Sequence, residues 1–167
     1  MHKLFIIVFS IALGYCHSCK SNLSDTEDEI TKMYLERMNK FQIASTPDEK
    51  AIIYVDYITD DAIWMPQNQE EIHGKDEIFH WAVWFFSTYK YFPDQGEPKH
   101  ENSVIKGDIA YHRFTSKGIY VAIETSDTIS YNQKYLDIMR KIKGEWKIAC
   151  HMWSSNNTER SIWSFKK

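Results

Sequence analysis

The segment DDAIWMPQNQEEIHGKDEI, residues 60–78, carries the clearest structural signal in the chain. Residues 62–65 form a short apolar run that Pro66 ends, which is typical of a β-strand. A polar connection leads to Gly74, and the acidic residues that follow this glycine are typical of the first turn of a helix. The segment therefore predicts a strand, a turn and a helix in close succession, as in a pocket-forming α+β domain.

The composition sets bounds on the rest of the chain. It has 167 residues, of which 43% are hydrophobic and 15% aromatic, so it can fill one core but is too short for two ordinary domains. The formal charge of -3 and the lack of a long Lys/Arg run argue against nucleic-acid binding. With 6 glycines, the sequence shows neither a Gly-x-Ser-x-Gly elbow nor a glycine-rich phosphate loop. We expect a small-molecule ligand, no nucleic acid and no cofactor.

The amino-terminal residues 1–18 are predicted to be a signal peptide. Lys3 supplies a basic start, and residues 4–13 form an apolar run of signal-peptide length that is too short to span a bilayer. We therefore expect export to the bacterial cell envelope.

Two cysteines follow the apolar run. Cys19 stands directly after the small residue Ser18, as in the acceptor site of a bacterial lipoprotein, whereas a tyrosine precedes Cys16. The prediction is a lipid anchor at Cys19, which would be the chain's only contact with a membrane. The alternatives are plain secretion and a Cys-x-x-Cys redox or metal pair, although such a pair normally opens a helix in a folded core. Cys150 is expected to be a small buried hydrophobe.

Three helices are expected in the first half of the chain. After a tether at residues 19–23, Ser24 begins a capping box, and an apolar stripe continues to about residue 43. A second start signal stands at residues 46–49, with a proline at the first helical position. The third helix covers residues 75–89 and has a broad apolar face.

Beyond residue 98 the hydrophobic period changes from helical to alternating. Four runs with turn signals between them predict an antiparallel meander, at residues 100–105, 109–122, 128–141 and 146–155. The domain is thus expected to span residues 24–156, with residues 157–167 as a C-terminal tail. Helices that close the wide end of such a curled sheet would leave a cone-shaped pocket.

Four short motifs occur in an order that resembles a known family. They are DDAIWMP at 60–66 with GKD at 74–76, GDIAY at 107–111, GEWKI at 144–148 and WSSN at 153–156. Over residues 30–156 the chain resembles the SnoaL-like branch of the ketosteroid isomerase and nuclear transport factor 2 superfamily. The resemblance implies a cystatin-like α+β barrel, in which a cone-shaped, curled antiparallel sheet is closed by three N-terminal helices. It also implies a homodimer formed through the sheet.

The same resemblance bears on the chemistry. The isomerase-like enzymes carry a general-base aspartate just before the proline of the first motif. Met65 stands there in this chain, in a strand one residue shorter, so that mechanism is not implied. The pocket varies from member to member, and the fold alone does not give the function.

Alternation along the last strand indicates other candidates. One face receives Trp146, Ile148, Cys150 and Met152, and the other receives Lys147, Ala149, His151 and Trp153. The second set, with a tryptophan beside an imidazole, is typical of a pocket lining.

The partners of this strand depend on the preceding turn. A three-residue turn at 142–144 would place Asp137 opposite Ala149 and Tyr135 opposite His151. Asp137 and His151 would then be diagonal neighbours on one surface, close enough to act as a catalytic acid–base pair. A two-residue turn would reverse the facing. The structural alternative for His151 is a hydrogen-bonded core residue.

An arginine is a further candidate. Residues 109–115, IAYHRFT, are similar to a strand of the association domain of calmodulin-dependent kinases. That resemblance implies that Arg113 points into the pocket, where it could hold a substrate carboxylate or pair with Asp137. The other two pocket arginines of that domain correspond to Asp137 and Trp153 here, so its anion site is not reproduced.

The aromatic residues expected to bind ligand are Trp64, Tyr111, Tyr135, Trp153 and Tyr57, with packing of the cone walls as the alternative for the tryptophans. The histidines show no metal-ligand spacing, so we expect no bound metal. Two hypotheses remain. The domain binds a small, partly apolar ligand in an aromatic pocket, or it is a cofactor-independent isomerase, dehydratase or hydrolase that uses His151 and Asp137. The missing general-base aspartate favours the first.

Overall fold

The computed structural model of the chain describes residues 23–96 and 98–156, and side chains from residue 29 onward. The predicted signal peptide, the Cys16 and Cys19 sites and the C-terminal tail lie outside these residues. The elements follow in the order α1 (Leu23–Ile43), α2 (Pro47–Asp56), β1 (Ile58–Met65), β2 (Ile72–His73), α3 (Gly74–Thr88), β3 (Tyr89–Pro93), β4 (Lys99–Lys106), β5 (Ile109–Ala122), β6 (Thr128–Ile142) and β7 (Glu145–Ser155). Within the described part of the chain, no helix is long and apolar enough to cross a bilayer.

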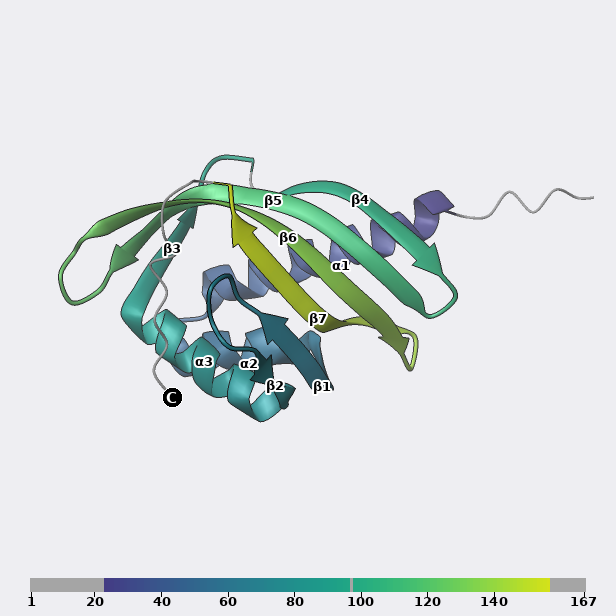
Figure 1. Cartoon of the computed structure of the whole chain (residues 1–167), viewed down its shortest axis with the longest axis horizontal. Coiled ribbons are helices and arrows are strands. Elements are labelled where there is room, and N and C mark those ends of the chain that lie inside the picture. The colour runs from purple at the N-terminus through teal and green to yellow at the C-terminus, as the bar shows by residue number, and fades with distance from the viewer. Residues whose placement is uncertain (1–22, 97, 157–167) are drawn as a thin grey trace, which may run out of the picture.

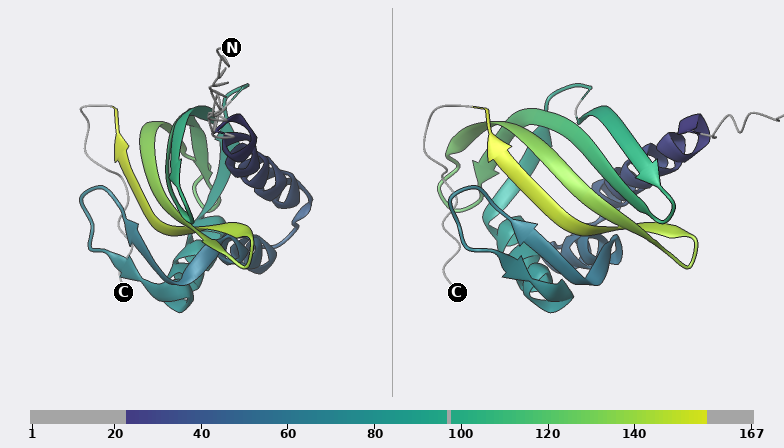
Figure 2. Two further views of the ribbon diagram at one scale, coloured as in Figure 1. Left: turned by 90° about the vertical axis from the view of Figure 1, so that its right-hand side faces the viewer. Right: turned by 45° about the vertical axis from the view of Figure 1, so that its right-hand side comes forward.

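The seven strands form one curled sheet in the order β2-β1-β7-β6-β5-β3. On the outer edge of β5, β3 pairs with the second half of the strand and β4 with the first half. The helices lie against the concave side of this sheet, which stays open rather than closing into a barrel (Figure 1 and Figure 2). The predicted α+β class and curled sheet with three helices are therefore confirmed. One detail differs: β1 pairs with β7 in parallel, so the sheet is not wholly antiparallel.

The signals that start the helices act as the sequence predicts in α2. Thr46 caps this helix, because its hydroxyl oxygen accepts from the Glu49 amide at 3.2 Å while Glu49 accepts from the Thr46 amide at 3.1 Å. The matching box predicted at Ser24 lies outside the described side chains. At α3, Gly74 has a φ of 77°, a left-handed conformation that glycine adopts without strain.

The segment at residues 60–78 contains one element that the sequence did not reveal. Between β1 and α3, the two-residue strand β2 turns back and pairs with β1, placing Ile72 opposite Trp64. Strand, turn and helix are present as predicted, and the added pairing ties the start of α3 to the sheet edge.

The β6–β7 connection is a two-residue turn, the second of the two alternatives that the sequence left open. Lys143 and Gly144 both have positive φ, at 52° and 87°, which is the backbone of a type I′ hairpin. Further along, the register steps from Met139 opposite Ile148 to Ile138 opposite Cys150, so Ala149 is an extra residue in β7.

The two-residue turn and the bulge at Ala149 each reverse which face of the sheet the β7 side chains point to, so beyond the bulge the two effects cancel. The shorter turn shifts the register by one residue and would reverse the strand, and the bulge shifts it by one more and restores the expected facing beyond it. Trp146 and Ile148, which precede the bulge along β7, are therefore buried, and so are His151 and Trp153, which follow it. The prediction that these two pairs lie on opposite faces was wrong, because it assumed unbroken alternation.

Candidate functional site

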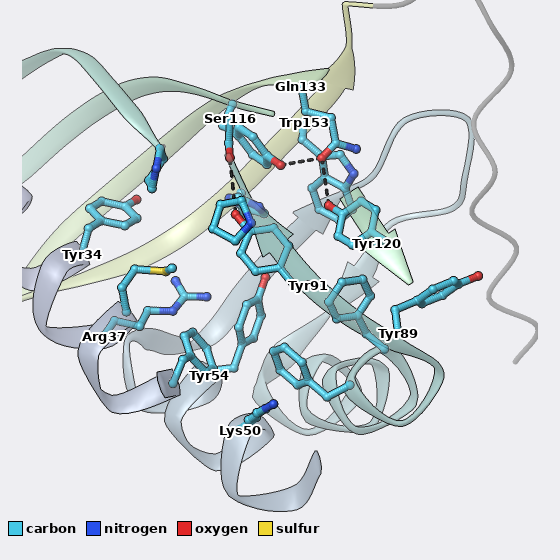
Figure 3. A pocket seen from close by; sticks show the side chains of 18 of the residues that line it. Tyr34, Arg37, Lys50, Tyr54, Tyr89, Tyr91, Ser116, Tyr120, Gln133 and Trp153 are labelled. Carbon is cyan, nitrogen blue, oxygen red and sulfur yellow. Dashed lines mark hydrogen bonds between the residues drawn. The ribbon is translucent and has the colours of Figure 1, made fainter. Parts of the chain in front are cut away.

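A cavity of about 420 Å³ lies between the concave side of the sheet and the helices. All three helices and strands β3, β5, β6 and β7 contribute to its wall (Figure 3). Most of the wall is aromatic, and its rings include Tyr34, Phe41, Tyr54, Trp81, Phe85, Phe86, Phe114, Tyr120, Tyr135 and Trp153. An interior of this kind is compatible with binding of a small, partly apolar ligand.

One imidazole on this wall is held by a buried carboxylate. Asp137 lies directly opposite His151 in the β6–β7 register, and the His151 Nδ1 is 2.5 Å from the Asp137 Oδ1. The hydroxyl of Tyr34 donates to the other carboxylate oxygen. Asp137 is 0% exposed, whereas His151 reaches the cavity. The sequence placed this pair on one surface as diagonal neighbours, and the structure makes them direct cross-strand partners.

The geometry of this pair orients the ring. An ionised carboxylate only accepts hydrogen bonds, so the His151 Nδ1 donates to Asp137, and in the neutral ring the Nε2 then presents its lone pair. Among the described residues no partner of that Nε2 is found. The arrangement therefore offers a proton acceptor at the wall of an aromatic cavity, with Asp137 behind it to stabilise the imidazolium that would form.

A second histidine lies in the same cross-strand row. His112 in β5 is opposite Asp137 in β6 and opposite Ser103 in β4, and it is almost fully buried. Its Nδ1 is 2.7 Å from the Ser103 Oγ, and its Nε2 is 2.9 Å from the Nδ1 of His100. Burial lowers the pKa of His100, an effect that the charge of Asp137 partly offsets. From the sequence, both histidines were considered only as metal ligands, because their place in one polar row depends on strand register.

Three tyrosines of the cavity are held in the protonated form by their surroundings. Burial raises the pKa values of Tyr34, Tyr120 and Tyr135 well above the ordinary value, and neighbouring tyrosines or Asp137 add to the effect. Tyr120 and Tyr135 both donate to the Gln133 Oε1, at 3.4 Å and 2.5 Å. These hydroxyls are neutral donors, which can stabilise negative charge on a ligand oxygen.

The structure places Arg113 and Tyr111 outside the cavity. In the first half of β5 the buried positions are Ala110, His112 and Phe114, so Arg113 and Tyr111 alternate onto the convex face. Arg113 forms an ion pair with Glu101 at 2.6 Å and does not contact Asp137. The inward placement inferred from the kinase association domain was therefore wrong. The alternation of β5 was readable in the sequence and would have corrected it.

Of the other aromatic candidates, two line the cavity and two lie outside its wall. Tyr135 and Trp153 line the cavity as predicted. Trp64 does not line it and instead packs behind His151, with ring centroids 5.0 Å apart and its Nε1 donating to the Tyr54 hydroxyl at 3.1 Å. Tyr57 is also outside the cavity wall, and its hydroxyl donates to Glu36 at 3.2 Å.

A buried cation that sequence reasoning missed lies on the helical wall. Arg37 in α1 lines the cavity and is 9% exposed, with its guanidinium carbon 4.2 Å from the ring centroid of Tyr54. The cavity wall also includes Lys50, and none of its described residues is an aspartate or glutamate. A signal was present, because Arg37 stands three residues after Tyr34 and four before Phe41, within the apolar stripe of the helix.

In the part of the chain that the structure describes, no group of three or more His, Cys, Asp or Glu side chains is arranged to hold a metal ion. The expectation of no bound metal stays a prediction.

No family model and no curated protein sequence matches the chain. Solved structures do. A ketosteroid isomerase-like protein from Erwinia carotovora atroseptica is 18% identical, with 83% of this chain and 98% of that chain covered and a TM-score of 0.66. A proposed scytalone dehydratase from Novosphingobium aromaticivorans is 12% identical, with 86% and 92% covered and a TM-score of 0.64.

A third similar structure is a nuclear transport factor 2-like protein with a cystatin-like fold, also from Novosphingobium aromaticivorans. It is 12% identical, with 83% of this chain and 86% of that chain covered and a TM-score of 0.59. Likeness at these identities concerns the fold rather than the activity. The chain therefore has the cystatin-like fold of nuclear transport factor 2-like and ketosteroid isomerase-like proteins.

Proposed function

We propose that the domain binds a small, partly apolar molecule in its aromatic cavity and moves a proton on it, as a cofactor-independent isomerase or dehydratase. The observation that carries the proposal is the His151–Asp137 contact of 2.5 Å at the cavity wall. The names of two structural neighbours refer to isomerisation and dehydration, and both reactions begin with proton removal from carbon. The absent aspartate at Met65 removes one general base, and His151 supplies another at a different place in the pocket.

The proton would follow a short path. The His151 Nε2 accepts a proton from a carbon next to a carbonyl, and the electron pair of the broken C–H bond forms an enolate. Asp137 stabilises the imidazolium through Nδ1, and the protonated Tyr135 hydroxyl would turn from the Gln133 Oε1 to donate toward the developing oxyanion. Return of the proton to another carbon gives isomerisation. Return of the proton to a departing hydroxyl gives water and a new double bond.

A generic carbon acid can test this chemistry without the natural substrate. The base removes the C3 proton of 5-nitrobenzisoxazole, the C–H electrons form a nitrile, and the N–O bond breaks to release a coloured phenolate. We expect the wild type to convert this probe about 100-fold faster than His151→Gln, the low end of what a positioned base contributes. His80→Gln is the matched control, because His80 is exposed on α3. Equal rates for wild type and His151→Gln would contradict the proposal.

We also propose that the chain is exported and lipid-anchored at Cys19. Support comes from the basic start, the apolar run at residues 4–13 and the small residue before Cys19. Mass spectrometry of the mature protein from bacterial cells, with and without Cys19→Ser, tests the anchor. We expect a diacyl mass on the wild-type amino terminus that the variant lacks. An unmodified amino terminus beyond Cys19 would contradict it.

A homodimer formed through the convex face of the sheet is a further proposal. Two rows of apolar side chains cross this face by register, Tyr111–Ile138–Cys150 and Leu136–Met152–Met65. Tyr111, Ile138 and Met152 are 37%, 38% and 42% exposed. Exposed apolar patches of this kind often mark protein interfaces, and a second copy of the chain would present the same rows.

A further inference from the structure

We propose that Arg37 is an anion-binding residue of the cavity, so that the natural ligand is an apolar, ring-containing molecule with a carboxylate. The proposal rests on the proposed function in one respect, since it takes the ligand to occupy the cavity that His151 lines. It goes further by naming the charge of the ligand and the residue that recognises it.

The burial and isolation of Arg37 support this role. Among the residues that the structure describes there are three arginines, and two of them, the exposed Arg113 and the half-buried Arg140, pair with Glu101 and Asp61. Arg37 is 9% exposed, its Nε has no hydrogen-bond partner, and no described carboxylate lies within 4.0 Å of its guanidinium. The buried arginine is thus the one without a counter-charge.

A buried guanidinium without a counter-ion is unfavourable, because it has lost water and gained no equivalent partner. The rings of Tyr54 and Phe41, at 4.2 Å and 5.5 Å from the guanidinium carbon, offset part of this penalty through cation–π attraction. The buried Nε–H has no partner and is left for another group. A carboxylate matches the donor fork of a guanidinium, and the described residues of the cavity wall supply none.

The remaining charges around the cavity favour an anion as well. Lys50 is a second cation on the wall, and the nearby acid, Asp137, is fully buried behind it and accepts from both Tyr34 and His151. Asp137 therefore does not neutralise Arg37 or Lys50 from within the cavity. Among the described residues of the wall, a carboxylate that entered would meet two cations and no acid.

The position of Arg37 relates the anchor to the proton-transfer site. Tyr34 and Arg37 are one helical turn apart on α1, and Tyr34 donates to Asp137. Figure 3 shows the guanidinium pointing into the cavity between Tyr34 and Tyr54. A carboxylate bound to Arg37 would therefore lie about one helical turn along α1 from Tyr34, which contacts the Asp137 that holds His151. The aromatic rings of the cavity wall suit the apolar body of the ligand.

Matched pairs of acids and amides test the proposal by binding alone. The probes are 2-naphthoate with 2-naphthamide and cinnamate with cinnamamide, and the measurement is the Kd of each from isothermal titration calorimetry. We expect the wild type to bind at least one acid about tenfold or more tightly than its amide, as a charge-assisted hydrogen bond would give. Arg37→Gln should lose this preference, and Arg37→Lys should keep part of it.

Arg113→Gln is the control, because it removes an arginine that lies outside the cavity. It should leave the preference unchanged. Equal binding of the acid and the amide by the wild type, binding of neither, or a preserved preference in Arg37→Gln would each overturn the proposal. His151→Gln separates it from the proposed function, since this variant should lose conversion of 5-nitrobenzisoxazole and retain the acid preference.

Discussion

Arg37 illustrates how one residue can be unfavourable for folding and useful for binding. Its charge is buried beside aromatic rings without a carboxylate partner among the described residues. Residues of this kind persist where a ligand supplies the missing interaction. The unpaired charge should therefore affect stability even when no ligand is bound.

Replacing Arg37 with methionine should stabilise the ligand-free protein. The substitution removes a desolvated charge and keeps a long apolar side chain against Tyr54, so we expect a gain of about 1 kcal/mol, at the low end of such replacements. Urea unfolding followed by circular dichroism measures it. Arg113→Met is the control, because its exposed ion pair with Glu101 should contribute within about 0.5 kcal/mol. A clear loss of stability in Arg37→Met would mean that the guanidinium is well paired in the folded state.

His100 gives the protein a defined response to acid. Because burial lowers its pKa in the folded state, the unfolded chain binds the proton more readily, and stability is lost as pH falls below the unfolded value of about 6.5. We expect the melting temperature to fall between about pH 7.5 and about pH 5.5. His100→Phe should fall less steeply over the same interval, since it packs against Phe114 but does not titrate.

Melting curves at several pH values compare the two slopes, and the exposed His80→Gln serves as control. Equal slopes for the wild type and His100→Phe would remove His100 as the source. The comparison uses slopes because His100→Phe also loses the contact with the His112 Nε2 at 2.9 Å and starts from a lower stability.

At the scale of elements, β5 is the strand that organises the sheet edge. One half of it pairs with β4 and the other half with β3, so two short strands share one long edge. Gly118 lies where β3 ends on β5, and an added Cβ there would come within 2.3 Å of the Phe92 carbonyl oxygen and 2.8 Å of the Tyr131 hydroxyl. The close approach of β3 to β5 thus depends on the missing side chain.

Gly118→Ala should therefore separate β3 from β5. We expect a loss of about 2 kcal/mol from overpacking, with faster amide hydrogen exchange concentrated in β3. Gly107→Ala is the comparison, because nothing lies within 4 Å of its Cβ and only its positive φ of 62° opposes the change. If β3 exchange is unchanged in Gly118→Ala, the strand tolerates the extra methyl group by a small shift.

The elements also show where sequence reasoning succeeded. The predicted strands match β4 to β7 within a residue or two, because alternation and the turn glycines mark their ends. The sequence predicted that Asp137 and His151 share a face, but it assumed a three-residue turn and an unbroken strand. The two-residue turn and the bulge at Ala149 offset each other's effect on the facing of β7, and alternation reveals neither. The parallel β1–β7 pairing joins strands that are far apart in the sequence, so no local sequence pattern predicts it.

The residues of the site were predicted less well, for physical reasons that differ. Arg113 was placed from a resemblance against the alternation of its own strand. Arg37 was overlooked because a charge inside an apolar helix stripe looks like a break in the pattern. His112 was weighed only as a metal ligand, whereas its role in the row with Asp137 depends on strand register. Pairing across strands carries this information, and a single sequence does not state it.

For the whole molecule, the proposed dimer should depend on the convex face of the sheet. Ile138→Lys places a charge in the centre of the apolar rows, so we expect a dimeric wild type and a monomeric variant in light scattering after size-exclusion chromatography. Ile52→Lys is the control, because Ile52 is exposed on α2. A monomeric wild type at micromolar concentration would contradict the proposal.

The setting of His151 between two indoles has a spectroscopic consequence. Its ring centroid lies 5.0 Å from Trp64 on one side and 5.0 Å from Trp153 on the other, and Trp153 in turn contacts Trp81. A protonated imidazole quenches the emission of a neighbouring indole by accepting an excited electron. The charge on His151 should therefore be visible as a dimming of the intrinsic fluorescence, so that a stopped-flow instrument could follow the proton as it arrives and leaves, with no added label.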